Sequence, residues 1–233
     1  MLLLLKLRSR LCSGKIVQQQ VTCEGRQLAV IVVDMWNNHW CSGAKQRMDA
    51  LAIKLNVYLK MMRRLGATII YSPSGYGAEP ARHIPLAHVD FPLGPDLNEP
   101  KFPLDTLEDW GCETGEWPPV ECWDRQHPGI EVFHEDWHSD NGIAVRGFLA
   151  EHGIVYTLLT GVHTNMCVLD ADFGARSMVR HGFKVALVRD MGDILYNPAK
   201  PPYVSRARGF VLTFRHVEKF ICPTIVSHGI MIL

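Results

Sequence analysis

A series of short apolar runs, separated by segments with helical spacing, restricts the fold of this chain more than any other feature. The runs, interpreted as strands, are residues 28–33, 67–71, 130–133, 154–159 and 183–188. The longer ones lack polar alternation, which is typical of parallel strands buried on both faces. Segments whose apolar residues recur every three to four positions are interpreted as helices at 44–65, 141–152, 167–181 and 204–220. This alternation predicts an α/β fold, a three-layer α/β/α sandwich around a mostly parallel sheet of about five or six strands.

Domain organisation follows from length and from two stretches that break this pattern. The 233 residues fit one large domain, which we place at residues 26–233. Residues 72–129 are rich in proline and tryptophan and show little periodicity, so we expect an insertion packed over one end of the sheet. Residues 1–25 are basic, with no acidic residue before Glu24, and are interpreted as a tail or a targeting segment outside the fold.

Charge and cysteine content exclude several classes of function. Lys plus Arg and Asp plus Glu both number 24, which removes the electrostatic argument for a nucleic-acid partner. The leading apolar run, residues 1–5, is too short to cross a membrane, so no membrane partner is expected. Seven irregularly spaced cysteines favour a reducing compartment over a disulfide framework. We expect a cytoplasmic protein, with a mitochondrial location as the alternative because of the basic start.

Residues 158–168 (LLTGVHTNMCV) carry the clearest chemical signal. A buried strand ends there, and Cys167 opens the next predicted helix. The unpaired N–H groups and the positive dipole end of a helix favour a thiolate, the nucleophilic form of cysteine. On position alone, a small buried apolar side chain is an equally good interpretation of Cys167.

Other reactive groups follow two further predicted strands. Asp34 follows the strand at 28–33, and His134, Glu135 and Asp136 follow the strand at 130–133. The carboxyl ends of parallel strands meet at one edge of a sheet, where ligands bind. An acid, a cation and a thiol are therefore expected together, which is the set that amide hydrolysis needs.

Three segments resemble the isochorismatase-like cysteine hydrolases, a superfamily that includes the nicotinamidases. They are an apolar strand ending in Asp34, the Gly-Val-x-Thr-x-x-Cys-Val pattern at 161–168, and the Gly-x-x-Val-x-x-Val-x-Asp pattern at 182–190. The segments occur in the order found in that superfamily and span much of the chain. Residues 196–198 and 217–224 resemble a less familiar branch of it.

The resemblance implies a role for each matching residue. Cys167 would attack a carbonyl carbon and form a covalent acyl-enzyme, and Asp34 would act as the acid-base. Backbone N–H groups near His163 and Cys167 would hold the oxyanion, and the peptide joining Val162 to His163 would be cis. The family lysine has no counterpart, because no lysine lies between Lys101 and Lys184.

His134 stands at the position expected for that lysine. A protonated histidine can hold a thiolate as an ion pair, and the neighbouring Glu135 and Asp136 would raise its pKa. A loop histidine after a strand also needs no function, so the cation is either His134 or missing.

The remaining site predictions concern the substrate pocket and metals. Residues expected to line the pocket are Trp36, His39, Trp40, Asn165 and Asp136. Nicotinamidases carry an Asp-x-His zinc pair in this half of the chain. Here Asn37 replaces the acid and is a poor zinc ligand, so neither a metal nor another cofactor is expected. Cys112 and Cys122 lack the tight spacing of zinc sites, and Cys41 and Cys222 are interpreted as structural.

The predicted function is cleavage of the C–N bond of a small amide through an acyl-enzyme on Cys167. Two alternatives remain on the same scaffold. One is vinyl-ether hydrolysis of the isochorismatase type, which needs the acid but no cysteine nucleophile. The other is a non-catalytic protein that binds a small molecule. The resemblance also implies a homo-oligomer, with a small-molecule substrate as the other partner.

Overall fold

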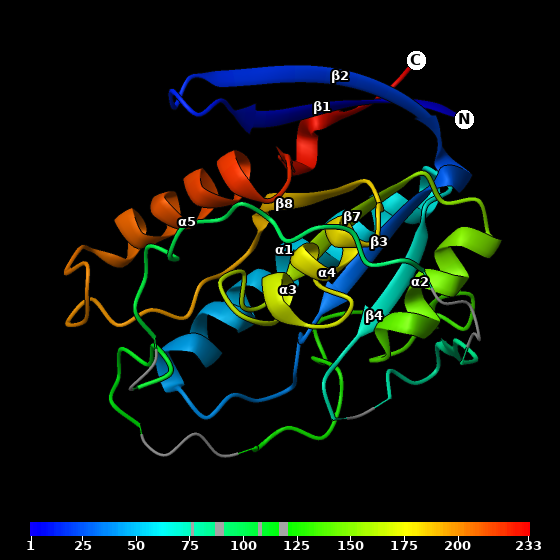
Figure 1. Ribbon diagram of the computed structural model, residues 1–233. Coiled ribbons are helices and arrows are strands. Elements are labelled where there is room, and N and C mark those ends of the chain that lie inside the picture. Colours follow the sequence, from blue (N-terminus) through cyan, green and yellow to red (C-terminus); the bar gives the residue numbers. More distant parts are fainter. Residues whose placement is uncertain (76, 87–90, 107–108, 117–120) are drawn as a thin grey trace.

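The computed structural model describes residues 1–75, 77–86, 91–106, 109–116 and 121–233. One ten-stranded sheet forms its centre, in the order β10-β1-β9-β8-β7-β3-β4-β6-β5, with β2 paired to β1 (Figure 1). The strands are β1 (Leu2–Arg10), β2 (Ile16–Glu24), β3 (Leu28–Val33), β4 (Thr68–Ser72), β5 (Arg82–His83), β6 (Trp137–His138), β7 (Tyr156–Gly161), β8 (Val185–Gly192), β9 (Thr224–Ile225) and β10 (Ile230–Ile232). The helices are α1 (Ser42–Arg64), α2 (Gly142–Glu151), α3 (Cys167–Asp170), α4 (Ala175–Arg180) and α5 (Arg206–Phe220), with 3-10 turns at Gly25–Gln27 and Ser227–Gly229.

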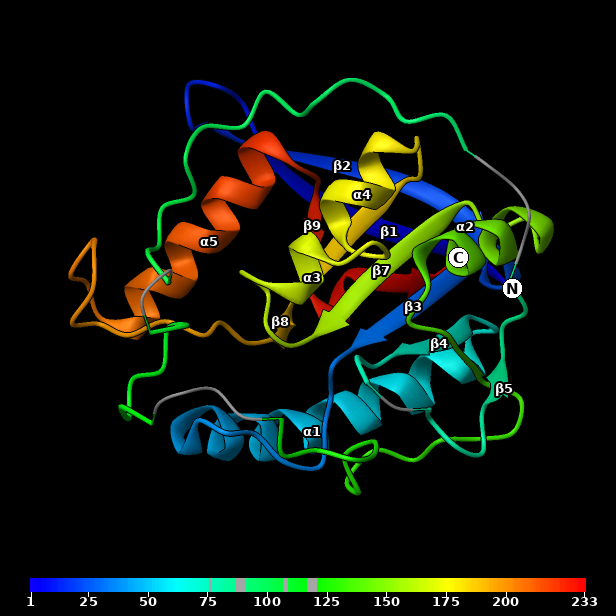
Figure 2. The same cartoon turned by 60° about the horizontal axis from the view of Figure 1, so that its bottom comes forward.

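The predicted fold class is confirmed. β3 lies at the centre between β4 and β7, and both pairs are parallel. The β7–β8 and β8–β9 pairs are parallel as well, and the antiparallel strand pairs of the described residues all involve β1. Helix α1 covers one face of the sheet, while α2, α4 and α5 cover the other (Figure 2). The strand number differs from the prediction, because short strands and the amino-terminal hairpin extend the sheet at both edges.

The alternation of side chains along β3 explains the two apolar layers. Leu28, Val30 and Val32 pack with α1, whereas the intervening Ile31 and Val33 belong to the cluster formed with α2, α4 and α5. All six residues of β3 are buried. A strand covered on both faces has no polar side, which is why its sequence is a continuous apolar run.

The interpretation of residues 1–25 as a segment outside the fold is wrong. β1 and β2 form an antiparallel hairpin along their full lengths, and β1 also pairs with β9 and β10. Leu3, Leu5 and Leu7 alternate into the core beside α1. The arginines that suggested a basic tail instead form ion pairs with a glutamate of α5, more than 200 residues away.

The predicted strand at residues 130–133 is also wrong, and the parallel strand of this region is β6. The carbonyl of Glu131 accepts hydrogen bonds from the Tyr71 hydroxyl and from Arg63, at 3.1 Å each. Its backbone is therefore held by side chains instead of a strand ladder. β6 pairs with β4 through Trp137 and His138.

The helix predicted at 167–181 is divided into α3 and α4. Between them, the carbonyl of Asp172 accepts a 2.7 Å hydrogen bond from the buried Arg146 of α2, which holds this backbone out of a continuous helix. The predicted helix at 204–220 is present as α5, and Gly209 does not interrupt it. A side chain at Gly209 would meet the ring of Tyr196, so the glycine permits close packing there.

The insertion at 72–129 contains β5 but otherwise crosses the surface without regular structure in its described residues. Glu99 pairs with Arg176 of α4 and with His216 of α5, which holds one part of it against that face. Further along, Glu113 pairs with Arg47 of α1, and His127 lies 2.7 Å from Asp49 of the same helix. The insertion therefore passes over both helical layers. Within the described residues, no helix is long and apolar enough to span a membrane.

Candidate active site

The carboxyl ends of β3 and β7 bring Asp34 and the segment before Cys167 to the same edge of the sheet. Val33 and Gly161 are register partners at these ends, and the amide of Val162 donates to the carbonyl of Val33 at 3.0 Å. Gly161 has φ +98°, and a Cβ there would lie 2.1 Å from the Val33 carbonyl oxygen. Only glycine allows the two strand ends to approach this closely.

Asp34 is completely buried behind the site. Its φ of 47° lies in the left-handed region, which aspartate tolerates better than most residues. Oδ1 accepts a 2.7 Å hydrogen bond from the amide of Ser74. Within the described residues Oδ2 has no such partner, so this oxygen is available to accept the thiol proton. Burial raises the pKa of Asp34 to about 6, and favourable interactions with the Cys167 thiol and Ser74 offset part of the shift.

Cys167 begins α3 and is partly buried. Burial raises the pKa of its thiol above the usual range, and the negative charge of Asp34 adds to this effect. Its own backbone N–H acts in the opposite direction but is the weaker influence. The expectation that the helix start favours a thiolate is therefore wrong, because α3 has only four residues and its N–H groups do not outweigh burial and the charge of Asp34. The resting pair is a thiol beside a carboxyl group.

The Val162–His163 peptide is cis, as the family resemblance predicted. His163 is buried, and burial lowers its pKa well below the usual value, so its ring is neutral. In the described part of the chain its Nε2 has no hydrogen-bond partner.

A cavity of about 850 Å³ opens in front of Cys167. Its lining residues are Trp36, His39, Trp40, Ser74, Thr106, Trp110, Glu121, Trp123, His163, Asn165, Met166, Cys167, Asp170, Ala171 and Leu195. Four of the five predicted pocket residues are among them. Sequence reasoning missed those contributed by the insertion, namely Ser74, Thr106, Trp110, Glu121 and Trp123, as well as Met166, Asp170, Ala171 and Leu195. The high tryptophan content of the insertion was the signal that could have identified it as a cavity wall.

Contacts within the cavity wall hold two of the predicted pocket residues, Trp36 and Asn165, in place. Trp36 stacks on Trp123 of the insertion, with ring centroids 3.9 Å apart. Asn165 uses both groups of its side-chain amide on the backbone of Leu195, at 2.8 and 2.9 Å. It therefore fixes this loop, and one N–H and one lone pair of its amide are not used by these two bonds.

His39 presents a hydrogen-bond donor to the cavity. Its Nδ1 accepts the amide N–H of Cys41 at 2.9 Å. Burial lowers the pKa of His39 to about 4, so the ring is neutral at neutral pH. The single ring proton of this neutral imidazole consequently lies on Nε2.

The structure does not bring His134 and Asp136 to the cavity, which corrects both predictions. His134 precedes β6 instead of following a strand, and its side chain is 81% exposed and paired with Glu135. Asp136 is buried, but its carboxylate binds Arg63 at 2.7 and 3.0 Å. Both positions depended on the strand at 130–133, which does not form.

The described residues that line the cavity include no lysine and no arginine. The positive charges of Arg47 and Arg206 help to lower the pKa of His163. Both guanidinium groups are paired with Asp193. Glu121 and Asp170 contribute negative charge to the wall. The cavity is therefore aromatic and acidic, and its described lining lacks the cation found in the family triad.

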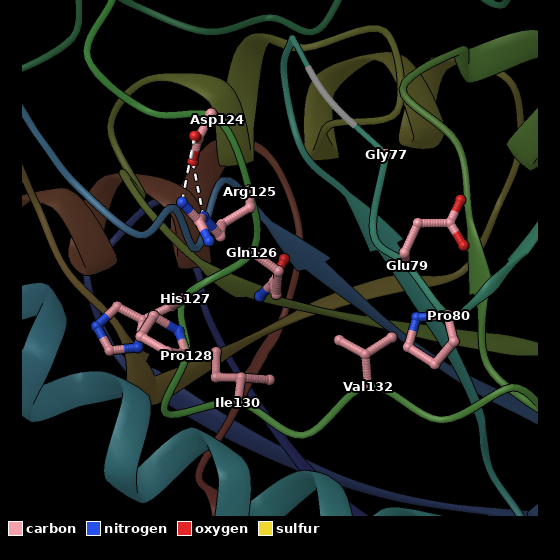
Figure 3. A pocket seen from close by; sticks show the side chains of 10 residues that line it. All are labelled: Gly77, Glu79, Pro80, Asp124, Arg125, Gln126, His127, Pro128, Ile130 and Val132. Carbon is pink, nitrogen blue, oxygen red and sulfur yellow. Dashed lines mark hydrogen bonds and ion pairs between the residues drawn. The ribbon is translucent and has the colours of Figure 1, made fainter.

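A second cavity, of about 410 Å³, lies between residues 77–80 and 124–132 (Figure 3). It shares no described lining residue with the Cys167 cavity. The neighbouring residues Asp124 and Arg125 form an ion pair at one side of it, so their charges compensate one another. None of its described lining residues is a cysteine, serine or lysine, so it offers no thiol, hydroxyl or amine nucleophile of the kind that Cys167 supplies in the other cavity. We therefore assign the candidate active site to the Cys167 cavity.

Among solved structures, the chain is similar to a cysteine hydrolase from Pseudomonas syringae pv. phaseolicola 1448A. The TM-score is 0.53 at 15% identity, covering 88% of this chain and 91% of that one. The chain has the isochorismatase-like fold. An isochorismatase from Pseudomonas putida KT2440 matches with a TM-score of 0.49 at 15% identity, over 88% of this chain and 91% of that one. No family model matches the chain, and no curated protein does.

The structural similarity to the cysteine hydrolase confirms the α/β architecture that the sequence predicted. In this chain the scaffold carries a cysteine and an aspartate at the carboxyl ends of its central strands. It departs from the family pattern at the third position, where no cation lines the cavity among the described residues.

Proposed function

We propose that the protein is a hydrolase that cleaves the C–N bond of a small amide through an acyl-enzyme on Cys167. The observation that carries this proposal is the buried Asp34 carboxyl group beside the Cys167 thiol at the base of an 850 Å³ cavity. The cysteine hydrolase with the same fold supports the reaction class.

The raised pKa of the thiol favours one mechanism of activation. Cys167 is not a preformed thiolate, so its proton must leave as the sulfur attacks. Asp34, whose pKa is about 6, is largely a carboxylate at neutral pH and accepts this proton. A C–S bond forms, and the carbonyl oxygen becomes an oxyanion held by backbone N–H groups such as that of Cys167.

The proton on Asp34 then passes to the leaving nitrogen as the C–N bond breaks. Ammonia or an amine departs, and a thioester remains on Cys167. Asp34 next takes a proton from water, whose oxygen attacks the thioester carbon. Breaking the C–S bond returns a proton to the sulfur and releases the carboxylic acid.

The test is incubation of the protein with a panel of small amides, followed by ammonia or amine detection and intact-mass measurement after acid quench. We expect release of amine and an acyl mass adduct on the Cys167 peptide. Cys167→Ala should lose both, whereas Cys12→Ala, at an exposed cysteine outside the cavity, should lose neither. Turnover without an adduct and with full activity in Cys167→Ala would contradict the proposal.

A second candidate is acid-base hydrolysis of a vinyl ether by Asp34 alone. The observation that favours it is the raised pKa of Cys167, which makes a poor nucleophile in the resting state. Full activity in Cys167→Ala, together with loss in Asp34→Asn, would select this reaction.

The pH dependence should report Asp34. We expect kcat/KM for an uncharged amide to rise with pH and level off above about 6, because the reaction needs the carboxylate form. Activity is lost as the pH falls through this pKa and the buried carboxyl group takes up its proton. No second inflection should occur near 8.5, the ordinary thiol value, because burial raises the pKa of Cys167. An inflection near pH 4, the ordinary value for aspartate, would contradict this assignment.

Substrate charge should matter because of the cavity wall. Four tryptophans and two acidic residues line it, with no lysine or arginine among the described residues. We expect a small amide bearing a trimethylammonium group to show a KM at least about tenfold lower than a carboxylate-bearing amide of equal size. Glu121→Gln should reduce this preference. Equal or inverted KM values would contradict it.

A further inference from the structure

Two buried cysteines from distant parts of the chain meet beside the start of α1. Cys41 is the N-cap residue of this helix, and Cys112 belongs to the insertion. Both are almost completely buried, and neither lines the Cys167 cavity. Glu116 joins them, so that one donor atom from each residue lies within 4.8 Å of the other two.

The contacts among these side chains are those of a compact donor set. Cys112 Sγ lies 3.1 Å from Glu116 Oε2, and Cys41 Sγ lies 3.4 Å from the Thr114 hydroxyl. A tetrahedral zinc ion with bonds of about 2.0–2.3 Å separates its ligand atoms by about 3.3–3.8 Å. Small side-chain adjustments bring the three donors to that spacing.

We propose that Cys41, Cys112 and Glu116 bind a thiophilic divalent cation, Zn²⁺. Two thiolates and a carboxylate are ligands that zinc prefers. Binding displaces the two thiol protons to solvent, so one ion is exchanged for two protons. The fourth position is taken by water or by Glu113, whose Oε2 lies 3.8 Å from Cys41 Sγ.

The local charge suits such a site. Two thiolates and one carboxylate would exceed the charge of the ion by one negative unit. Ser42 directs its amide N–H to Glu116 Oε1 at 3.3 Å, and the amino end of the 23-residue α1 adds positive potential. Arg47 lies close by, paired with Glu113.

The site would join two walls of the catalytic cavity without touching Cys167. Trp40 directly precedes Cys41, and Trp110 lies two residues before Cys112; both tryptophans line the cavity. Because Cys41 and Cys112 are separated by about 70 residues, the ion would fasten the insertion to α1. It is a positioning element and takes no part in the proposed hydrolysis.

The test is titration of the reduced, metal-free full chain with Co²⁺ and with Zn²⁺. We expect one Co²⁺ per chain with a thiolate-to-cobalt charge-transfer band, displacement of that cobalt by Zn²⁺, and release of two protons per zinc. The midpoint temperature of thermal unfolding should rise when zinc is added. These readouts do not depend on amide hydrolysis, so they separate this proposal from the proposed function.

Variants provide the controls. Cys112→Ser should weaken Co²⁺ binding at least about 100-fold, and Glu116→Gln should weaken it at least about tenfold. Glu116→Gln also keeps the proposal testable if Cys41→Ser or Cys112→Ser fails to fold. Cys122→Ser, at an exposed cysteine of the same insertion, should bind like wild type. Absence of a charge-transfer band in the reduced protein, or a Cys41–Cys112 disulfide without metal binding after its reduction, would overturn the proposal.

Discussion

Asp34→Asn is expected to lower kcat/KM for amide hydrolysis by about 10²–10⁴-fold, the usual contribution of a positioned general base. The substitution preserves size, and the side-chain oxygen can still accept the amide N–H of Ser74. It removes the group that we propose accepts the thiol proton. Since burial raises the pKa of Cys167, solvent hydroxide cannot replace that base near neutral pH.

The same variant should be more stable than wild type above pH 6. Burial raises the pKa of Asp34 to about 6 from 3.8, so the folded protein binds this proton more tightly than the unfolded chain does. Wild type therefore loses stability as the pH rises between these two values, whereas the Asp34→Asn variant has no proton to lose at this position. We expect a gain of about 1–3 kcal/mol in the free energy of unfolding at pH 7, which disappears below about pH 4.

Urea denaturation at pH 4 and pH 7, together with kinetics, measures both effects. Asp96→Asn, the same substitution at an exposed carboxylate paired with Arg180, is the control and should change neither quantity. Full activity in Asp34→Asn would remove the general base from the mechanism. A stability loss at pH 7 would show that the carboxylate is better compensated than its burial indicates.

Glu218→Gln is expected to destabilise the fold by about 3–5 kcal/mol. The Glu218 side chain is completely buried in α5 and binds Arg8 at 2.6 Å and Arg10 at 2.8 Å, both from β1. It also accepts a 2.7 Å hydrogen bond from Thr224 of β9. Removing the one negative charge leaves a partly buried arginine cluster uncompensated.

Chemical denaturation measures this loss, and hydrogen exchange should show that β1 and β2 open first, because their anchor to α5 is weakened. Glu131→Gln, which removes an exposed pair with Lys60, is the matched control and should leave the midpoint unchanged. If Glu218→Gln unfolds at the same urea concentration as wild type, the arginine cluster does not depend on Glu218.

The elements that the sequence predicted correctly are those that form because of residues close to one another in the chain. β3 is a continuous apolar run because it is covered on both faces. Asn141 caps α2 by accepting the amide N–H of Ala144 at 3.0 Å. Asp34 follows β3 directly and Cys167 follows β7 after a short loop, so their meeting at one edge is expected from the parallel topology.

The errors arose where distant contacts decide the structure. The arginines of β1 look like a basic tail until Glu218 is placed beside them. Residues 130–133 have strand-like composition, but Arg63 and Tyr71 bind the carbonyl of Glu131, and no strand forms there. His134 therefore does not lie at the predicted site. The meeting of Cys41 with Cys112 likewise depends on an insertion whose path has no periodic signal.

The sheet positions Asp34 and Cys167, whereas the insertion supplies much of the cavity wall, and this separation has an evolutionary consequence. The reactive pair is built on β3 and β7, inside the best-packed layer of the molecule, whereas Thr106, Trp110, Glu121 and Trp123 come from a segment with almost no regular structure in its described residues. Such segments tolerate exchange of sequence and length better than core strands do. If the proposed hydrolysis holds, substrate selectivity can change through the insertion, or be re-engineered by loop grafting, while the proposed reactive pair on the core strands stays the same.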